Sequence, residues 1–127
     1  MNNPGKTILA VLSDLMFTVK IQEAAKRAAI DVIFVTNRED ALQAAKSGPT
    51  LILLDLNGKS VDALEFIGTL KTDSETQHIP LVGYVSHVQT DLKQAAQDRG
   101  CDLVVARSAF SQNLPSILDR YFSSAKQ

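Results

Sequence analysis

Five short apolar runs are spaced along the chain, and a stretch with apolar residues at helical spacing follows each of them. The runs occupy residues 7–12, 31–36, 51–55, 81–85 and 103–106. Segments this short and this apolar are typical of strands that are buried on both faces of a sheet. The alternation therefore predicts five βα units in succession.

Capping and breaking residues mark the joints between these segments. The first helix is expected over about residues 15–29. The predicted helix caps are Asn37, Ser60 and Thr90, and Gly48-Pro49 and Gly100 are predicted to stop helices. The fourth helix carries little apolar bulk, so we expect it to pack loosely. The clearest amphipathic stripe, in the fifth helix, consists of Leu114, Ile117, Leu118, Tyr121 and Phe122.

Five βα units with short connections predict a parallel sheet with helices on both faces, because parallel crossovers are right-handed. The expected fold class is α/β, a single flavodoxin-like (βα)5 doubly wound sheet with strand order 2-1-3-4-5. The 127 residues have the size of one domain. We expect the domain to span 6–123 and the termini, 1–5 and 124–127, to be frayed.

The charge balance and the single cysteine narrow the class of protein. Thirteen basic and fourteen acidic residues give no electrostatic reason to expect nucleic acid or an anionic membrane as the partner. Cys101 cannot form an internal disulfide, no segment has membrane-spanning length, and the first residues lack a signal-peptide pattern. These features predict a cytoplasmic location.

The third apolar run ends on a carboxylate, that of Asp55. In a doubly wound sheet the ligand crevice lies at the carboxyl ends of the strands, between the first and third strands in this order. The sequence therefore predicts one site that includes Leu12, Ser13, Asp14 and Asp55, with the strand exits Val85-Ser86 and Arg107-Ser108 nearby.

The chain resembles the receiver domain of two-component response regulators, the CheY-like superfamily, over essentially its full length. The matching segments are Leu53-Leu54-Asp55-Leu56-Asn57, Asp62-Ala63-Leu64-Glu65-Phe66, Ile79-Pro80 and Gly100-Cys101-Asp102. No segment is diagnostic alone, but the set in this order is specific. The resemblance implies that Asp55 accepts a phosphoryl group from a histidine kinase and that the backbone carbonyl of Asn57 joins a Mg²⁺ shell.

Phosphoryl transfer depends mainly on neutralising the charge of the transferred group, and the family supplies Mg²⁺, a hydroxyl and a lysine for this purpose. This sequence departs from that set. In a gapless alignment the acidic pair that holds the metal is replaced by Leu12 and Ser13. A shift of one residue would place Ser13-Asp14 at the pair, but it puts polar Thr18 and Gln22 at apolar helix positions.

The other pocket positions also differ from the family pattern. Val85 falls at the switch hydroxyl with Ser86 one residue later, Val104 replaces the switch aromatic, and Arg107-Ser108 stand where Lys-Pro is usual. The planar fork of Arg107 does not reproduce a lysine point charge, although it can bridge Asp55 directly. Mg²⁺ would have only Asp14, Asp55 and Asn57 as ligands. We therefore expect no cofactor, or Mg²⁺ if the pocket is a functional phosphorylation site.

Other chemistry-bearing residues have plain explanations. Gly58-Lys59-Ser60 lacks the first glycine of a phosphate-binding loop. His78 and His87 have no partners at zinc spacing, and Cys101 is most simply a small apolar filler. The serines at the strand exits show no histidine-and-acid arrangement. We therefore expect no enzymatic activity.

Three functional hypotheses remain. The first is a divergent pseudo-receiver that binds signalling proteins, such as a histidine kinase or an output protein, or a second copy of itself. The family resemblance places this contact on the face of the fourth helix, fifth strand and fifth helix. The second is a working phospho-acceptor phosphorylated on Asp55. The third is a flavodoxin-type small-ligand-binding protein or enzyme, although the loop at 13–17 is bulky for a phosphate site.

Overall fold

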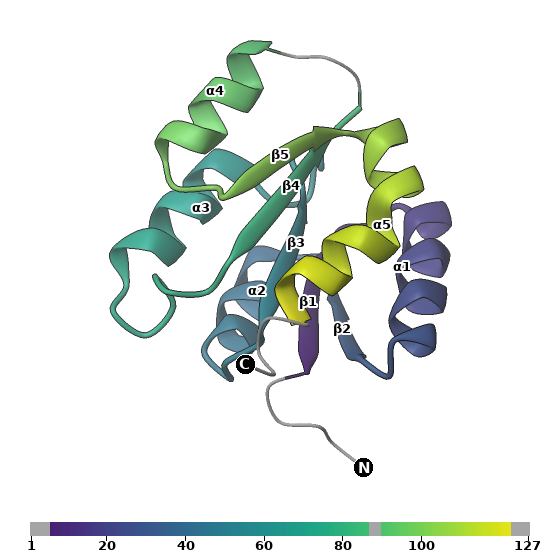
Figure 1. The fold of residues 1–127 in the computed structure, drawn as a ribbon. Helices are drawn as coiled ribbons and strands as arrows, with labels where there is room; N and C mark the ends of the chain where they lie inside the picture. Colours follow the sequence, from purple (N-terminus) through teal and green to yellow (C-terminus); the bar gives the residue numbers. More distant parts are fainter. Residues whose placement is uncertain (1–5, 87–89, 123–127) are drawn as a thin grey trace.

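Strands and helices alternate along the whole domain (Figure 1). The structure, a computed structural model, describes residues 6–86 and 90–122. The expected frayed ends, 1–5 and 124–127, and His87 lie outside these ranges. The elements are β1 (Thr7–Val11), α1 (Leu15–Arg27), β2 (Asp31–Val35), α2 (Arg38–Ala45), β3 (Leu51–Asp55), α3 (Ala63–Thr72), β4 (Leu81–Val85), α4 (Thr90–Asp98), β5 (Leu103–Ala106) and α5 (Arg107–Phe122).

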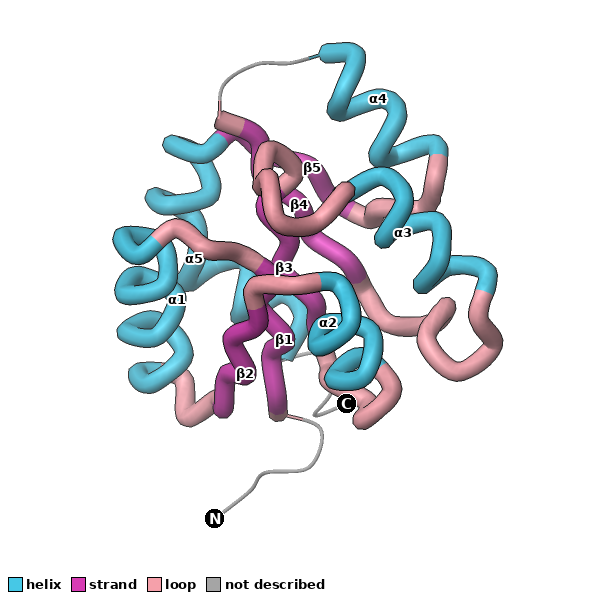
Figure 2. The backbone as a smooth tube through the Cα atoms, turned by 180° about the vertical axis from the view of Figure 1, so that it is seen from behind, coloured by secondary structure: helices cyan, strands magenta, loops and turns pink. Residues whose placement is uncertain are grey.

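The five strands form one parallel sheet in the order β2-β1-β3-β4-β5. This confirms the predicted fold class and strand order. Helices α1 and α5 cover one face, and α2, α3 and α4 cover the other (Figures 1 and 2). None of the helices in the described ranges is long and apolar enough to cross a bilayer.

Each face of the sheet has its own hydrophobic core, because alternate residues of the buried strands point to opposite faces. Leu51 and Leu53 of β3 face α1 and α5, whereas Ile52 and Leu54 face α2 and α3. All four side chains are at most 1% exposed. The dense apolar run therefore reflects a strand that is covered on both sides, as the sequence predicts.

An aromatic cluster fills the core under α1 and α5. The ring centroids of Phe17 and Tyr84 are 4.8 Å apart, those of Tyr84 and Phe110 4.9 Å, and those of Phe17 and Phe110 5.7 Å. Such pairs add about 0.5–1.5 kcal/mol each beyond the burial of their area. The cluster fixes the first turns of α1 and α5 against β4, at the end of the sheet where the predicted site lies.

The helix caps confirm one prediction and correct another. The side chain of Asn37 caps α2 by accepting the N–H of Asp40 at 2.9 Å. Ser60 is not the cap of α3: Asp62 accepts the N–H of Glu65 at 3.2 Å. A carboxylate followed three residues later by an acid in the first turn is a strong start signal, and it overrides the serine. Thr90 is the first residue of α4 rather than a residue before it.

The last two helices differ in how much of their surface they bury. In α4 the single buried side chain is that of Ala96, which agrees with the expected loose packing. Helix α5 begins directly at Arg107, without a loop after β5. Four members of its predicted stripe are buried and the fifth, Tyr121, is partly buried.

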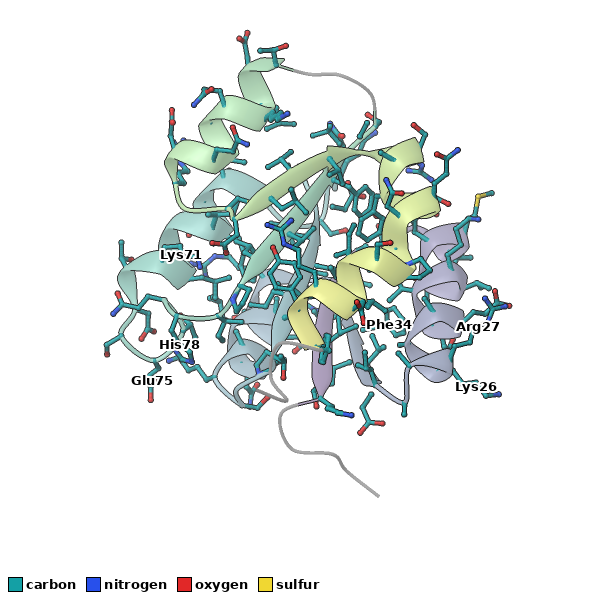
Figure 3. All side chains as sticks on the ribbon, viewed as in Figure 1. Lys26, Arg27, Phe34, Lys71, Glu75 and His78 are labelled. Carbon is teal, nitrogen blue, oxygen red and sulfur yellow. The ribbon has the colours of Figure 1, made fainter. Side chains whose placement is uncertain are left out.

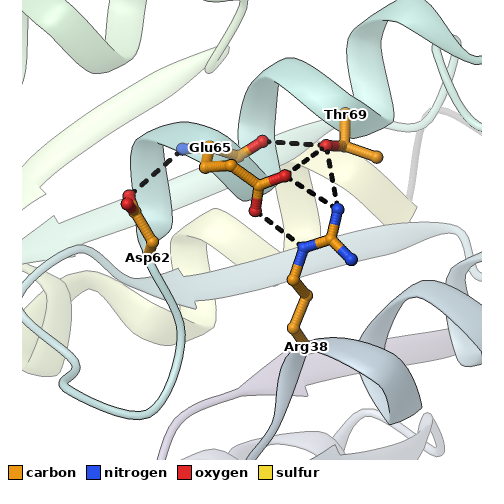
Figure 4. Close-up of polar contacts among 4 residues, drawn as sticks. All are labelled: Arg38, Asp62, Glu65 and Thr69. Carbon is orange, nitrogen blue, oxygen red and sulfur yellow. Dashed lines mark hydrogen bonds and ion pairs between the residues drawn. The ribbon is translucent and has the colours of Figure 1, made fainter.

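An exposed ion pair links α2 to α3, on the face of the sheet opposite to α1 and α5 (Figure 4). The guanidinium of Arg38 donates from Nε and Nη2 to the two carboxylate oxygens of Glu65, both at 2.7 Å. The hydroxyl of Thr69 donates to the same carboxylate at 2.8 Å. The hydrogen bond from Arg38, with that from Thr69, lowers the pKa of Glu65 to about 2.

Candidate functional site

The predicted site lies at the carboxyl ends of β1 and β3, where the crevice of this fold is expected. A small cavity of about 10 Å³ is lined by Val11, Leu12, Ser13, Thr36, Asp55, Gly58, Ser60 and Val61. The structure therefore brings Leu12, Ser13 and Asp55 together, as predicted. Space of this size holds roughly one water molecule.

Asp55 is the last residue of β3 and is partly buried. Its Oδ1 accepts the backbone N–H of Asn57 at 2.9 Å, so this oxygen is turned back toward its own loop. Burial raises the pKa of Asp55, and the nearby charge of Asp14 adds to this, against the lowering effects of the Asn57 N–H and Arg107. The folded environment therefore makes this carboxyl a weaker acid than a free aspartate.

Asp14 has a different environment, because both of its carboxylate oxygens have partners. Oδ1 accepts the backbone N–H of Phe17 at 3.2 Å and so caps α1. Oδ2 forms an ion pair with Nη2 of Arg107. Burial raises the pKa of Asp14, but the hydrogen bonds from Phe17 and Arg107 outweigh burial and the net shift is downward.

Arg107 pairs with Asp14 and not with Asp55, so the idea that it bridges Asp55 is wrong. The reason is the arrangement of α1 and α5, which cover the same face and bring the first residue of α5 beside the cap of α1. The guanidinium also lies over the ring of Phe17, 4.3 Å from its centroid. The ion pair and the cation–π contact together hold the arginine on α1.

The loop after β3 is tied to the exit of β4. The side-chain oxygen of Asn57 accepts from the backbone N–H of Ser86 at 2.6 Å and from its hydroxyl at 3.0 Å. The position predicted to match the switch hydroxyl is Val85, which is 3% exposed and packs in the core beneath α3 and α4. Val104, at the position of the switch aromatic, is buried in the same cluster.

Two further residues of β4 shape the site, and sequence reasoning did not single them out. Tyr84 is the register partner of Asp55 on the neighbouring strand. Its hydroxyl is buried and has no hydrogen-bond partner among the described residues. Gly83 leaves room for Leu56, since a Cβ there would lie 2.9 Å from the Leu56 side chain. Strand alternation places Tyr84 on the α1 and α5 face, but the unpartnered hydroxyl has no signal in the sequence.

The structure leaves few free donors for a Mg²⁺ ion at this site. Leu12 is apolar and buried, Ser13 is neutral, and Asp14 is engaged by Phe17 and Arg107. Within residues 6–86 and 90–122, no three His, Cys, Asp or Glu side chains are grouped so that they could hold a metal. Mg²⁺ prefers octahedral oxygen coordination and is usually held by one or two carboxylates together with waters. Asp55 is the carboxylate among the residues that line this cavity.

The larger hollows of the molecule lie away from this site. One of about 320 Å³ lies between the last turns of α1 and α5, and is lined by residues such as Arg27, Ile30 and Phe122. Another of about 410 Å³ lies between α1 and β2. The largest hollows therefore do not coincide with the predicted site, which is defined by the residues at the ends of β1 and β3.

No protein-family model matches the chain, and no curated protein matches it. Solved structures do match, among them response regulators and the receiver domain of a histidine kinase. The phosphorylated cyanobacterial phytochrome response regulator RcpA shares 24% identity, with a TM-score of 0.79 over 94% of this chain and 95% of that one. The manganese-bound form of the response regulator Rcp1 shares 20%, with a TM-score of 0.82 over 94% and 96%.

A third match is the receiver domain of a sensor histidine kinase from Pseudomonas aeruginosa, which has magnesium coordinated in its active-site cleft. It shares 17% identity, with a TM-score of 0.80 over 94% of this chain and 98% of that one. At these identities the matches show that the chain has the fold of receiver domains, over nearly the whole length of each. They do not carry the metal or the phosphoryl group over to this chain.

Proposed function

We propose that the chain is a receiver-like module of two-component signal transduction that acts mainly by binding other proteins. In this proposal the pocket around Asp55 is unfit for Mg²⁺-dependent phosphoryl transfer. The fold shared with receiver domains supports the first part. The contacts of Asp14 and Asp55 support the second.

The observation that carries the proposal is the engagement of Asp14. Its two oxygens accept from the Phe17 N–H and from Arg107, so binding a cation would cost both the helix cap and the ion pair. Among the described residues that line the cavity, which include Leu12 and Ser13, Asp55 supplies the one carboxylate. A divalent ion would therefore meet about one negative charge, where neutralisation of the phosphoryl oxygens requires a firmly held metal.

The two alternatives have less support. A working phospho-acceptor that uses Asp14 as a metal ligand needs Arg107 to release it. A flavodoxin-type ligand site needs room at the ends of β1 and β3. The cavity there holds about one water molecule, whereas ligand pockets are roughly 300–1,000 Å³.

The partner in this proposal is a signalling protein, such as a histidine kinase or an output protein. The face of α4, β5 and α5 is its proposed contact. Helix α4 buries only Ala96 among its side chains, so it can shift without disrupting much of the core. No residue of the pocket is assigned a catalytic role.

Phosphorylation separates this proposal from the working receiver. The protein is incubated with a small-molecule phosphodonor and Mg²⁺, and its intact mass is measured over time. We expect no added phosphoryl group on the wild-type protein. A stable phosphoryl adduct that is lost in Asp55→Asn, and retained in Asp62→Asn as a matched control on the α3 cap, would overturn the proposal.

A further inference from the structure

The exposed large hydrophobic side chains of the described residues lie on two consecutive elements. Leu15, Met16 and Val19 of α1 are 81%, 63% and 53% exposed, and Ile33 of β2 is 38% exposed. None lies on α4, β5 or α5, the face proposed for a signalling partner. Strand β2, which carries Ile33, lies at the edge of the sheet opposite β5 (Figure 2).

Strand β2 forms this edge and pairs only with β1 among the described strands. The N–H of Asp31 donates to the carbonyl of Lys6 at 3.0 Å, and the carbonyl of Val35 accepts from Leu12 at 3.2 Å. In a parallel pair the residues of one strand alternate between facing the neighbour and facing away. Since Asp31 and Val35 face β1, the N–H and C=O groups of Val32 and Phe34 point outward from the sheet.

This edge has few of the features that prevent strand pairing, and its one charged residue, Asp31, lies at the start of the strand. The five residues of β2 contain no proline and no lysine, and their register with β1 runs without a bulge. The central residues Val32, Ile33 and Phe34 are all apolar and none is fully buried. At the other edge, β5 has only four residues. An edge strand like β2 favours pairing with another extended strand.

A hollow runs beside the same strand. It has a volume of about 410 Å³ and is lined by Gln22, Lys26, Ala29, Ile30, Asp31, Val32 and Phe34. Phe34 of β2 and Lys26 of α1 lie on the same side of the molecule (Figure 3). The α1 face of β2 therefore has open space next to Val32 and Phe34 that an added strand could fill with apolar side chains.

We propose that two copies of the chain associate by antiparallel pairing of their β2 strands, which joins the two sheets into one. The two-fold axis passes beside Ile33. Val32 of each copy then lies opposite Phe34 of the other, and these pairs exchange the N–H···O bonds that point outward in the single chain. The proposal concerns the edge opposite the proposed partner face, and it does not depend on the function of Asp55.

The register follows from the side chains, and it favours a second copy over a foreign strand. Val32 packs across from Phe34 on the α1 face, and the two Ile33 side chains meet on the other face. Asp31 lies opposite Val35 of the other copy, so the two acids do not face each other. The same strand thus supplies both halves of a complementary pairing without a like-charge contact in the strand.

Sedimentation equilibrium of the full chain tests the proposal, over concentrations from about 1 µM to about 1 mM, the range of weak to moderate association. We expect a monomer–dimer equilibrium for the wild type. Ile33→Lys places two like charges across the axis and is expected to weaken dimerisation at least about tenfold. Gln94→Lys adds the same charge on α4 and is expected to leave the dimer unchanged; circular dichroism checks that both variants fold.

Met16→Lys separates pairing through β2 from association through the apolar residues of α1. A wild-type monomer at every concentration, or a dimer that Met16→Lys dissociates and Ile33→Lys does not, would overturn the proposal. Amide hydrogen exchange adds a readout of the backbone bonds. The amides of Val32 and Phe34 are expected to gain protection as concentration rises, while that of Ile33, which faces β1, keeps its protection throughout.

Discussion

The two acids at the carboxyl end of the sheet, Asp14 after β1 and Asp55 at the end of β3, have opposite environments. Asp14 accepts from a helix N–H and from an arginine, and its pKa is lowered. Asp55 accepts one loop N–H, has no ion pair among the described residues, and its pKa is raised by burial. Asp14, whose charge is stabilised, therefore caps a helix and pairs with an arginine. Asp55, whose charge has fewer partners, lines the cavity.

This difference shows that proximity to a pocket does not make a carboxylate available to a ligand. Whether a carboxylate can bind a ligand depends on how many of its oxygens already accept hydrogen bonds from the protein. A cation would have to displace Arg107 and the α1 cap to use Asp14, and it would have to offset the desolvation of Asp55. Substitutions at Asp14 and in the cavity beside Asp55 test this comparison.

The largest effect on stability is expected from Asp14→Ala. The substitution removes the α1 cap and leaves the partly buried Arg107 without its carboxylate, so the free energy of unfolding should fall by about 1–2 kcal/mol. Urea denaturation at neutral pH measures it. Asp62→Ala, which removes only the α3 cap, is the matched control and should cost less. Equal losses for the two variants would mean that Arg107 contributes nothing at this site.

Ser13→Asp tests whether the missing charge is what keeps a cation out. The new carboxylate lies in the cavity lining shared with Asp55, so Mg²⁺ affinity should rise at least about tenfold over the wild type. Amide chemical shifts during a Mg²⁺ titration report the change. Ser47→Asp adds the same charge in the turn after α2 and should have no such effect. If both variants respond alike, the gain reflects net charge and not the pocket.

The pH dependence should have opposite signs at the two acids. Asp14 titrates below its ordinary 3.8, so its contribution to stability is present above that pH and is lost as the pH falls toward the folded value. Asp55 titrates above 3.8, so stability declines as the pH rises through 3.8 to its folded value. Carboxyl ¹³C shifts resolve the two titrations. Asp55→Asn should remove the loss of stability above pH 3.8. A carboxyl of Asp14 that titrates at higher pH than that of Asp55 would contradict the account.

The smallest effect is expected at the exposed pair of Arg38 and Glu65. Its two hydrogen bonds are well formed, but both side chains are in solvent, where ion pairs contribute little. Arg38→Ala should change the urea midpoint by less than Asp14→Ala does. Its effect should also shrink in high salt. A loss as large as that of Asp14→Ala would show that ion-pair geometry, and not the combination of cap and burial, determines these stabilities.

The sequence predicts the fold well because the fold depends on local patterns. Residues 51–54 are apolar at every position, which fits a strand covered on both faces, and parallel βα units allow few topologies. Helix starts are less secure, since Ser60 and Asp62 are both good caps and only the contact to Glu65 distinguishes them.

The site is predicted less completely, because its decisive contacts join distant residues. Asp14 and Arg107 are 93 positions apart. Periodicity places each at the end of its element, but it does not say which acid the arginine meets. The same holds for Tyr84: its place on the strand can be predicted from the sequence, but its ring contacts with Phe17 and Phe110 join distant residues.

A Mg²⁺ titration of the wild-type protein, followed by amide shifts of Asp14, Asp55 and Asn57, tests the central claim most directly. The account predicts small, linear changes with no saturation up to about 10 mM, since one desolvated carboxylate gives a weak site. Saturation at low millimolar Mg²⁺, with shifts centred on Asp14 and Asp55 and loss of the Arg107 ion pair, would contradict it.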